Sequence, residues 1–237
     1  MGFWCLKRER TLKILSTLAV QGALPALVAR YEATTGIRVD VLFAPTNGLL
    51  GRIAAGEAAD LAILTRAAID DLAAKGVLLP ESVADVAVSR VGIAVKSGAA
   101  KPDISSVGAL KVALLQARSI SYSKIGASGV FFAELIERLG ISDAINAKAT
   151  IVPSGLTAEL AARGEVELAV QQVGELMLVP GIDVVGPLPA GAESVTMFSA
   201  GVLASSPRPE AALELMAYLR SSDAAQALGA AGLQPAA

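Results

Sequence analysis

The run VAVSRVGIAV, from Val86 to Val95, and the run SVTMFSAGVLA, from Ser194 to Ala204, decide the fold of this chain. Both runs are long and almost wholly apolar, which is typical of strands buried on both faces. Between them lies a region with its own alternation of strands and helices. The two runs therefore predict a middle lobe, residues 86–193, inserted into a first lobe formed by residues 1–85 and 194–237, with the runs as the two strands of a hinge.

The first lobe alternates short extended runs with helical faces. The expected strands are residues 12–16, 39–43 and 60–64. Leu24, Leu27, Val28 and Tyr31 follow the i, i+3, i+4, i+7 spacing of one helix face. An alternating β-α order of this kind predicts an α/β fold with a parallel sheet covered by helices on both faces.

The N-terminal stretch also fits a signal peptide. Lys7-Arg8-Glu9-Arg10 resembles a basic leader region, and residues 12–29 resemble the apolar segment that follows one. The strand and helix periodicity of the same residues favours the first β-α unit instead. We therefore expect a cytoplasmic protein from the chain as written, or a periplasmic one if the start is assigned wrongly. No stretch reaches the ~20 apolar residues of a membrane span.

The middle lobe shows the same alternation. We expect strands near residues 111–115 and 119–123, at 150–152 and at 167–171, and helices at 129–139 and 156–163, with Ser154 as the N-cap of the second helix.

Composition narrows the function. The 237-residue chain is 54% hydrophobic and 18% charged, with a net charge of -2 and no basic stripe, so we expect a small-molecule partner and no nucleic acid. It contains no histidine, which excludes Ser-His-Asp and Cys-His catalysis and the usual metal ligand sets. The single cysteine, Cys5, cannot form an internal disulfide. We expect no cofactor and no metal.

The order of motifs resembles a known family. The stretches that carry the resemblance are Leu12 to Ser16, Val39 to Leu50, Ala55 to Leu61, Gly126 to Phe131 and Leu168 to Gln172. Together they resemble the molybdate-binding proteins of ABC importers over nearly the whole chain. This resemblance implies the periplasmic-binding-protein type II fold, with two lobes, each a mostly parallel sheet flanked by helices, and a two-strand hinge. It also implies a small anion in the cleft between the lobes.

The resemblance assigns candidate ligand-binding residues. In that family hydroxyls and backbone N–H groups at helix N-termini hold the oxyanion, without a positive charge. Thr46, followed by Asn47, matches a hydroxyl donor of the first lobe. Ser128 and Gly129 match the anion loop of the second lobe.

Two positions depart from the family pattern. Ala19 stands where a serine is expected, which leaves Ser16 and Thr17 as the nearest hydroxyls, and Gln172 stands where a tyrosine is expected. Both departures favour a larger or differently shaped anion, such as a small carboxylate.

Each candidate also has a simpler interpretation. Thr46, Asn47 and Thr65 are placed to cap helices. Lys124 fits a solvated loop, although in a ligand site it would attract a carboxylate or act as an acid or base. Gln171 and Gln172 alternate on one strand, so only one is expected to face the ligand.

Two classes of function remain open. The first is a solute-binding protein that closes on a small anion and docks on an importer permease. The second is a cofactor-independent enzyme of the same fold, an isomerase of a small unsaturated polycarboxylate, as aconitate isomerase is. A cytoplasmic sensor is a third possibility.

Overall fold

The computed structural model describes residues 11–153 and 155–236. The predicted basic segment Lys7-Arg8-Glu9-Arg10, Cys5 and Ser154 lie outside these residues. The chain forms two compact units: unit 1 contains Met1–Val88 and Thr196–Ala237, and unit 2 contains Ser89–Val195. The chain passes between them within strand β4 (Ala84–Lys96) and at the start of strand β9 (Val195–Val202).

The sheet of unit 1 has the order β2-β1-β3-β9-β4, with β10 paired to β4. Its remaining strands are β1 (Thr11–Ser16), β2 (Arg38–Phe43), β3 (Leu61–Thr65) and β10 (Gln234–Pro235). Strand β1 is parallel to both β2 and β3, and Ser16 lies beside Phe43 on one side and Ile63 on the other. The carboxyl ends of all three strands therefore meet at one edge.

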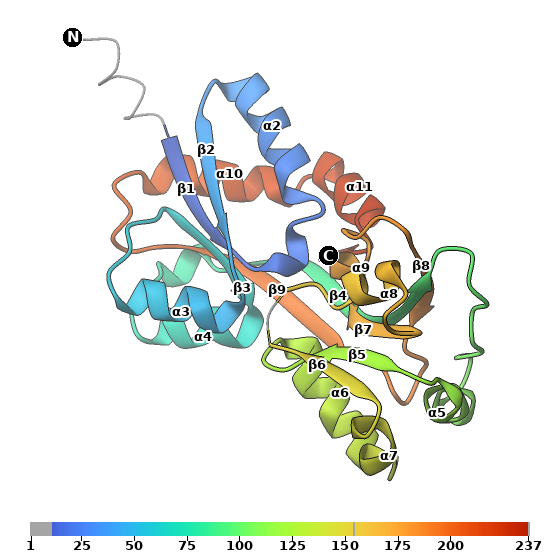
Figure 1. The fold of residues 1–237 in the computed structure, drawn as a ribbon. Helices are drawn as coiled ribbons and strands as arrows, with labels where there is room; N and C mark the ends of the chain where they lie inside the picture. Colours follow the sequence, from blue (N-terminus) through green and yellow to red (C-terminus); the bar gives the residue numbers. More distant parts are fainter. Residues whose placement is uncertain (1–10, 154, 237) are drawn as a thin grey trace. The chain divides into compact units, whose positions relative to one another are not determined.

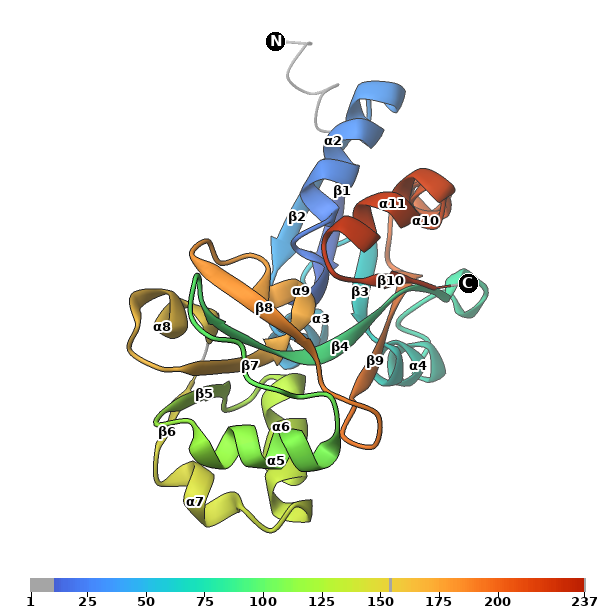
Figure 2. The ribbon, with the colours of Figure 1, turned by 90° about the vertical axis from the view of Figure 1, so that its right-hand side faces the viewer.

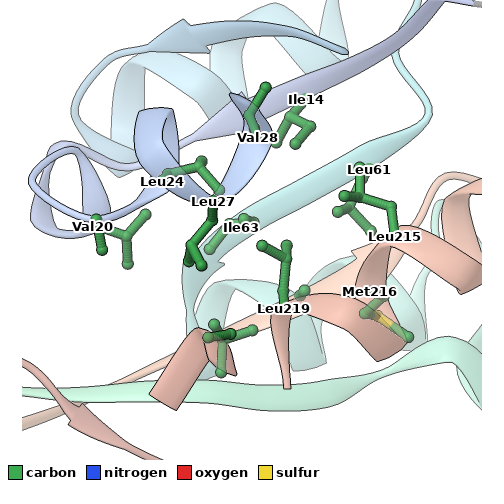
Figure 3. Close-up of a cluster of buried hydrophobic side chains, with 14 of the residues drawn as sticks. Ile14, Val20, Leu24, Leu27, Val28, Leu61, Ile63, Leu215, Met216 and Leu219 are labelled. Carbon is green, nitrogen blue, oxygen red and sulfur yellow. The ribbon is translucent and has the colours of Figure 1, made fainter. Parts of the chain in front are cut away.

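Helices cover both faces of this sheet, as Figure 1 shows. One face carries α2 (Leu24–Thr35), α10 (Pro209–Leu219) and α11 (Ser222–Ala230), which enclose an aliphatic core that includes Leu27, Ile63 and Leu215 (Figure 3). The other face carries α3 (Thr46–Ala54) and α4 (Arg66–Ala74). Two short 3-10 helices, Leu18–Val20 and Pro80–Ser82, complete the unit.

The predicted first β-α unit is confirmed. Residues 12–16 lie in β1, and Leu24, Leu27, Val28 and Tyr31 are the buried face of α2. The helix ends at Gly36, whose φ of 71° is the left-handed conformation that glycine adopts without strain.

Asp60, the residue before β3, forms a buried ion pair with Arg208. Asp60 is 1% exposed and accepts hydrogen bonds from the backbone N–H of Lys13 at 2.8 Å, the hydroxyl of Ser206 at 2.7 Å and the guanidinium of Arg208 at 3.1 Å. These bonds join β1 and β3 to the segment that follows β9.

Unit 2 has a sheet of order β4-β7-β5-β6, with β8 also paired to β4. Its strands are β5 (Ile120–Ser123), β6 (Ala149–Val152), β7 (Leu168–Gln172) and β8 (Ile182–Pro187). Strand β5 is parallel to β6 and β7, whereas β4 is antiparallel to β7 and β8. The parallel strands are as expected, and the antiparallel β4 and β9 make the sheet of each unit mixed.

Helices again lie on both faces of the unit 2 sheet, which Figure 2 displays. One face packs against α5 (Val107–Gln116), α6 (Ala127–Arg138) and α7 (Ser142–Asn146). The opposite face packs against α8 (Ala158–Arg163) and α9 (Val173–Leu176).

One element was predicted wrongly. Residues 111–115, expected as a strand, lie inside helix α5. The run KVALL, apolar after Lys111, fits either structure, but Leu110, Ala113 and Leu114 are buried with helical spacing. The hydroxyl of Ser106 accepts a hydrogen bond from the N–H of Ala109, and this N-cap starts the helix.

Candidate functional site

Hydroxyl side chains gather at the carboxyl edge of the parallel strands in unit 1. Ser16 ends β1 and is fully buried, and its hydroxyl donates to the carbonyl of Thr17 at 3.2 Å. Thr17 is 6% exposed, and its backbone N–H donates to the carbonyl of Ile63. Ala19 is buried in the short 3-10 helix that follows. The sheet therefore brings Ser16 and Thr17 beside the starts of α3 and α4.

Thr46, Asn47 and Thr65 do not cap helices with their side chains. The N-cap of α3 is Pro45, so Thr46 and Asn47 occupy its first turn, where Thr46 is half-buried and Asn47 is exposed. Thr65 is the N-cap residue of α4 but makes no side-chain capping bond. Thr46 and Asn47 therefore lie one and two residues beyond the cap position, whereas Thr65 occupies its predicted cap position without a side-chain bond.

In unit 2 the start of α6 lies very close to the end of β5. The hydroxyl of Ser123 accepts a hydrogen bond from the N–H of Gly126, the N-cap residue of α6, at 2.9 Å. A Cβ on Gly129 would lie 1.7 Å from the carbonyl oxygen of Ser123, so only glycine fits there. Gly129 thus has a packing role, whether or not it also contacts a ligand.

Ser128 is 2% exposed in the first turn of α6. Among the described residues its hydroxyl has no hydrogen-bond partner. The first N–H groups of a helix lack intrahelical acceptors and attract anions together with the helix dipole, although in α6 the N–H of Gly129 already donates to the carbonyl of Gly126 at 3.0 Å. This helix start therefore offers neutral donors of the kind expected for an anion site.

The two glutamines at the end of β7 face opposite sides of the sheet. Gln171 accepts hydrogen bonds at its Oε1 from the N–H and the hydroxyl of Thr157, at 2.8 and 2.9 Å, and so holds the entry to α8. Gln172 accepts at its Oε1 from the hydroxyl of Ser89 at 2.8 Å. Both are 3% exposed, and they alternate between faces as expected.

Glu175 is a functional candidate that the sequence did not reveal. It is half-buried in α9, three residues after β7 ends. Burial raises the pKa of its carboxyl to about 7, although hydrogen bonds from the Gln171 side chain and the Gln172 backbone lower it in part. A carboxyl with this pKa exchanges protons readily near neutral pH. The one signal in the sequence is an acidic residue three positions after the end of a buried strand.

Lys124 does not lie in a buried environment like that of Glu175. It is exposed in the loop after β5, its backbone N–H bonds to the carbonyl of Val152, and it lines an open surface pocket of about 570 Å³ with Tyr122 and Glu134. Its exposure removes the desolvation that an acid–base lysine needs.

Within residues 11–153 and 155–236, no group of three or more acidic or cysteine side chains is placed to hold a metal ion. In the same part of the chain, no helix is long and apolar enough to span a membrane.

The chain matches one family model, described as bacterial extracellular solute-binding protein, over residues 12–234. The chain belongs to this family. The match spans nearly all of both units, and it agrees with the resemblance drawn from the motif order. The predicted α/β fold of the periplasmic-binding type II class is confirmed by the solved structures to which this solute-binding chain is similar.

Two such structures are the Azotobacter vinelandii periplasmic molybdate-binding protein and the substrate-binding domain of a putative molybdenum ABC transporter from Clostridium difficile. The first has a TM-score of 0.78 at 19% identity and covers 94% of this chain and 98% of its own. The second has a TM-score of 0.75 at 15% identity and covers 96% and 99%. At these identities the likeness concerns the fold.

A curated relative is much more similar in sequence. An aconitate isomerase from Pseudomonas sp. is 38% identical over 231 residues, which cover 95% of this chain and 88% of the relative. This solute-binding chain is thus similar over nearly its whole length to a protein named as an isomerase.

Proposed function

We propose that this protein is an isomerase of a small unsaturated polycarboxylate of the aconitate type. The observation that carries the proposal is the 38% identity to an aconitate isomerase over nearly the whole chain. The absence of histidine is compatible with it, because an allylic proton shift requires one proton-transferring group and donors that hold the anion.

Glu175 fits the role of that group. In the proposed step its carboxylate removes a proton from the methylene carbon next to a substrate carboxylate. The electrons of the broken C–H bond form the new double bond, and the far carbon of the old double bond takes a proton back from the carboxyl. A pKa of about 7 allows the same group to accept and return the proton near neutral pH.

The proposed anion donors are the neutral groups already described. In unit 2 these are the Ser128 hydroxyl and the first-turn N–H groups of α6, with the amide of Gln172 at the neighbouring strand end. In unit 1 they are Thr46 and the hydroxyls of Ser16 and Thr17. That the two lobes close on one ligand stays a prediction.

The proposal is tested by measuring the turnover of aconitate. Purified protein is incubated separately with cis- and trans-aconitate, and the isomers are separated by chromatography. We expect interconversion from both sides, with Glu175→Gln slower by roughly 100-fold or more, since positioned acid–base groups contribute ~10²–10⁴-fold. Glu193→Gln, at an exposed position, is the matched control and should keep full activity. If the wild-type protein interconverts no such acid, the proposal is wrong.

A second candidate is passive binding of a small anion for delivery to an importer permease, which the family description favours. In that case a matched anion leaves the protein chemically unchanged and raises its melting temperature. A ligand at ~100 times its Kd adds about 2.7 kcal/mol. A panel of molybdate, tungstate, sulfate and small carboxylates separates the two functions, because only the isomerase changes its ligand.

Cellular location is part of the same question. A carrier for an importer must lie outside the cytoplasm, which fits the word extracellular in the family description, whereas the isomerase is compatible with the predicted cytoplasmic location. Fractionation of the native cells distinguishes the two.

A further inference from the structure

Arg90 lies in β4, within the first two residues of unit 2, and is half-buried. Within residues 11–153 and 155–236 its guanidinium has neither a hydrogen bond nor an ion pair. The other cations in this part of the chain that are not exposed all have acceptors: Lys13, Lys111, Lys148 and Arg208. Arg90 is therefore the half-buried cation of this part of the chain whose guanidinium is available to an outside anion, while its stem packs against the protein.

The alternation of β4 places Arg90 on a defined face. Val91 and Ile93 pack toward α6, whereas Ala94 packs with α8 and α9. Side chains alternate along a strand, so Arg90 and Gly92 share the face of Ala94. A Cβ on Gly92 would lie 2.7 Å from a methyl group of Val173, the first residue of α9.

This face is also the face of the proposed proton-transferring group. Gly92 lies directly opposite Gln171, whose side chain bonds to the carboxyl of Glu175. Arg90 precedes Gly92 by two residues, a distance of ~7 Å along the strand. Because β4 runs antiparallel to β7, Arg90 lies just past the carboxyl end of β7. No charged group is among the causes of the Glu175 pKa shift, so Glu175 does not neutralise Arg90.

We infer that Arg90 binds a carboxylate of the ligand beside the Glu175 end of β7. The inference rests on the proposed function and narrows its substrate class. Neutral helix N-termini suffice for a compact oxyanion, but a polycarboxylate carries several separated charges, and an arginine fork matches one carboxylate with two parallel hydrogen bonds. Arg90 is then the residue that selects polycarboxylates.

The experiment measures binding without turnover. Tricarballylate, the saturated analogue of aconitate, is titrated by calorimetry into the wild-type protein, Arg90→Gln, Arg90→Lys and Arg30→Gln. Arg30 is exposed on α2 and serves as the matched control for loss of one positive charge. We expect Arg90→Gln to weaken binding roughly 10- to 100-fold, Arg90→Lys to weaken it less because lysine lacks the planar fork, and Arg30→Gln to stay within twofold.

The outcomes separate this inference from the proposed function. If Arg90→Gln binds tricarballylate within twofold of the wild-type affinity, the inference is overturned. Arg90 then contributes only the packing of its aliphatic stem. If Arg90→Gln does not fold, Arg90→Lys decides by the same criterion. Loss of binding in the Arg90 variants together with no aconitate turnover by wild type supports the inference and overturns the isomerase. Failure of wild type to bind any polycarboxylate overturns both.

Discussion

The half-buried carboxyl of Glu175 makes the free energy of unfolding depend on pH, and a single substitution can test this dependence. Its pKa rises from 4.5 to about 7 on folding, and burial is the main cause. The folded protein therefore holds this proton more tightly than the unfolded chain does. Its contribution is fully present below about pH 4.5 and is lost as the pH rises to about 7. At 1.36 kcal/mol per unit of pKa, the loss is about 3 kcal/mol.

Glu175→Gln removes the ionisable group and keeps a side chain of the same size that still accepts a hydrogen bond. We expect this variant to be more stable than the wild-type protein by about 1 kcal/mol at pH 5 and by about 3 kcal/mol at pH 8. Urea unfolding at pH 5, 6, 7 and 8 measures the difference, with Glu193→Gln as the exposed control. If the two proteins keep a constant difference in the free energy of unfolding across this range, the carboxyl is not desolvated as described.

Three further predictions concern packing and the anion donors. Gly129→Ala places a methyl group against the carbonyl that ends β5 and should destabilise unit 2 by roughly 2–4 kcal/mol in urea unfolding, whereas Gly51→Ala, with open space around its Cβ, should be neutral or slightly stabilising. Ser128→Ala should weaken binding of the matched anion by roughly 10-fold and change the melting temperature little; the reverse pattern would make the hydroxyl structural. Asp60→Ala leaves Arg208 without its buried anion and should cost about 3–5 kcal/mol; a cost below about 1 kcal/mol would contradict the ion-pair geometry.

The sequence predicted the strands of unit 1 and helix α2 because their apolar residues recur with a clear period. The strand at 12–16 and the face of Leu27 and Tyr31 are examples. Residues 112–115 are all apolar, so periodicity did not distinguish a strand from a helix there, and the Ser106 cap decided the outcome.

The candidate site was less accessible to sequence reasoning. A hydroxyl or glycine at a strand-to-helix turn is visible in the sequence, which is why Ser128 and Gly129 were found. The pKa of Glu175 and the lack of a partner for Arg90 depend on burial and on contacts across strands, which no local pattern reports. Lys124 was weighed as the acid or base because its charge is visible, whereas its exposure is not.

The carboxyl of Glu175 also bears on the choice between the proposed isomerase and the alternative carrier. The carboxyl accepts bonds from the Gln171 amide and from the N-cap N–H of α9, and the second bond is a helix-capping interaction that a glutamine at the same position would also make. A glutamine would avoid the cost of a desolvated carboxylate, which is about 3 kcal/mol at neutral pH. Capping alone therefore gives no reason for an ionisable group here. A carrier that holds its anion with neutral donors gains nothing from a buried acid beside the ligand and loses affinity whenever that acid ionises. The proposed isomerase needs that group, with a pKa near the working pH, and a cation, the role inferred for Arg90, to hold the substrate carboxylates in place while the proton moves.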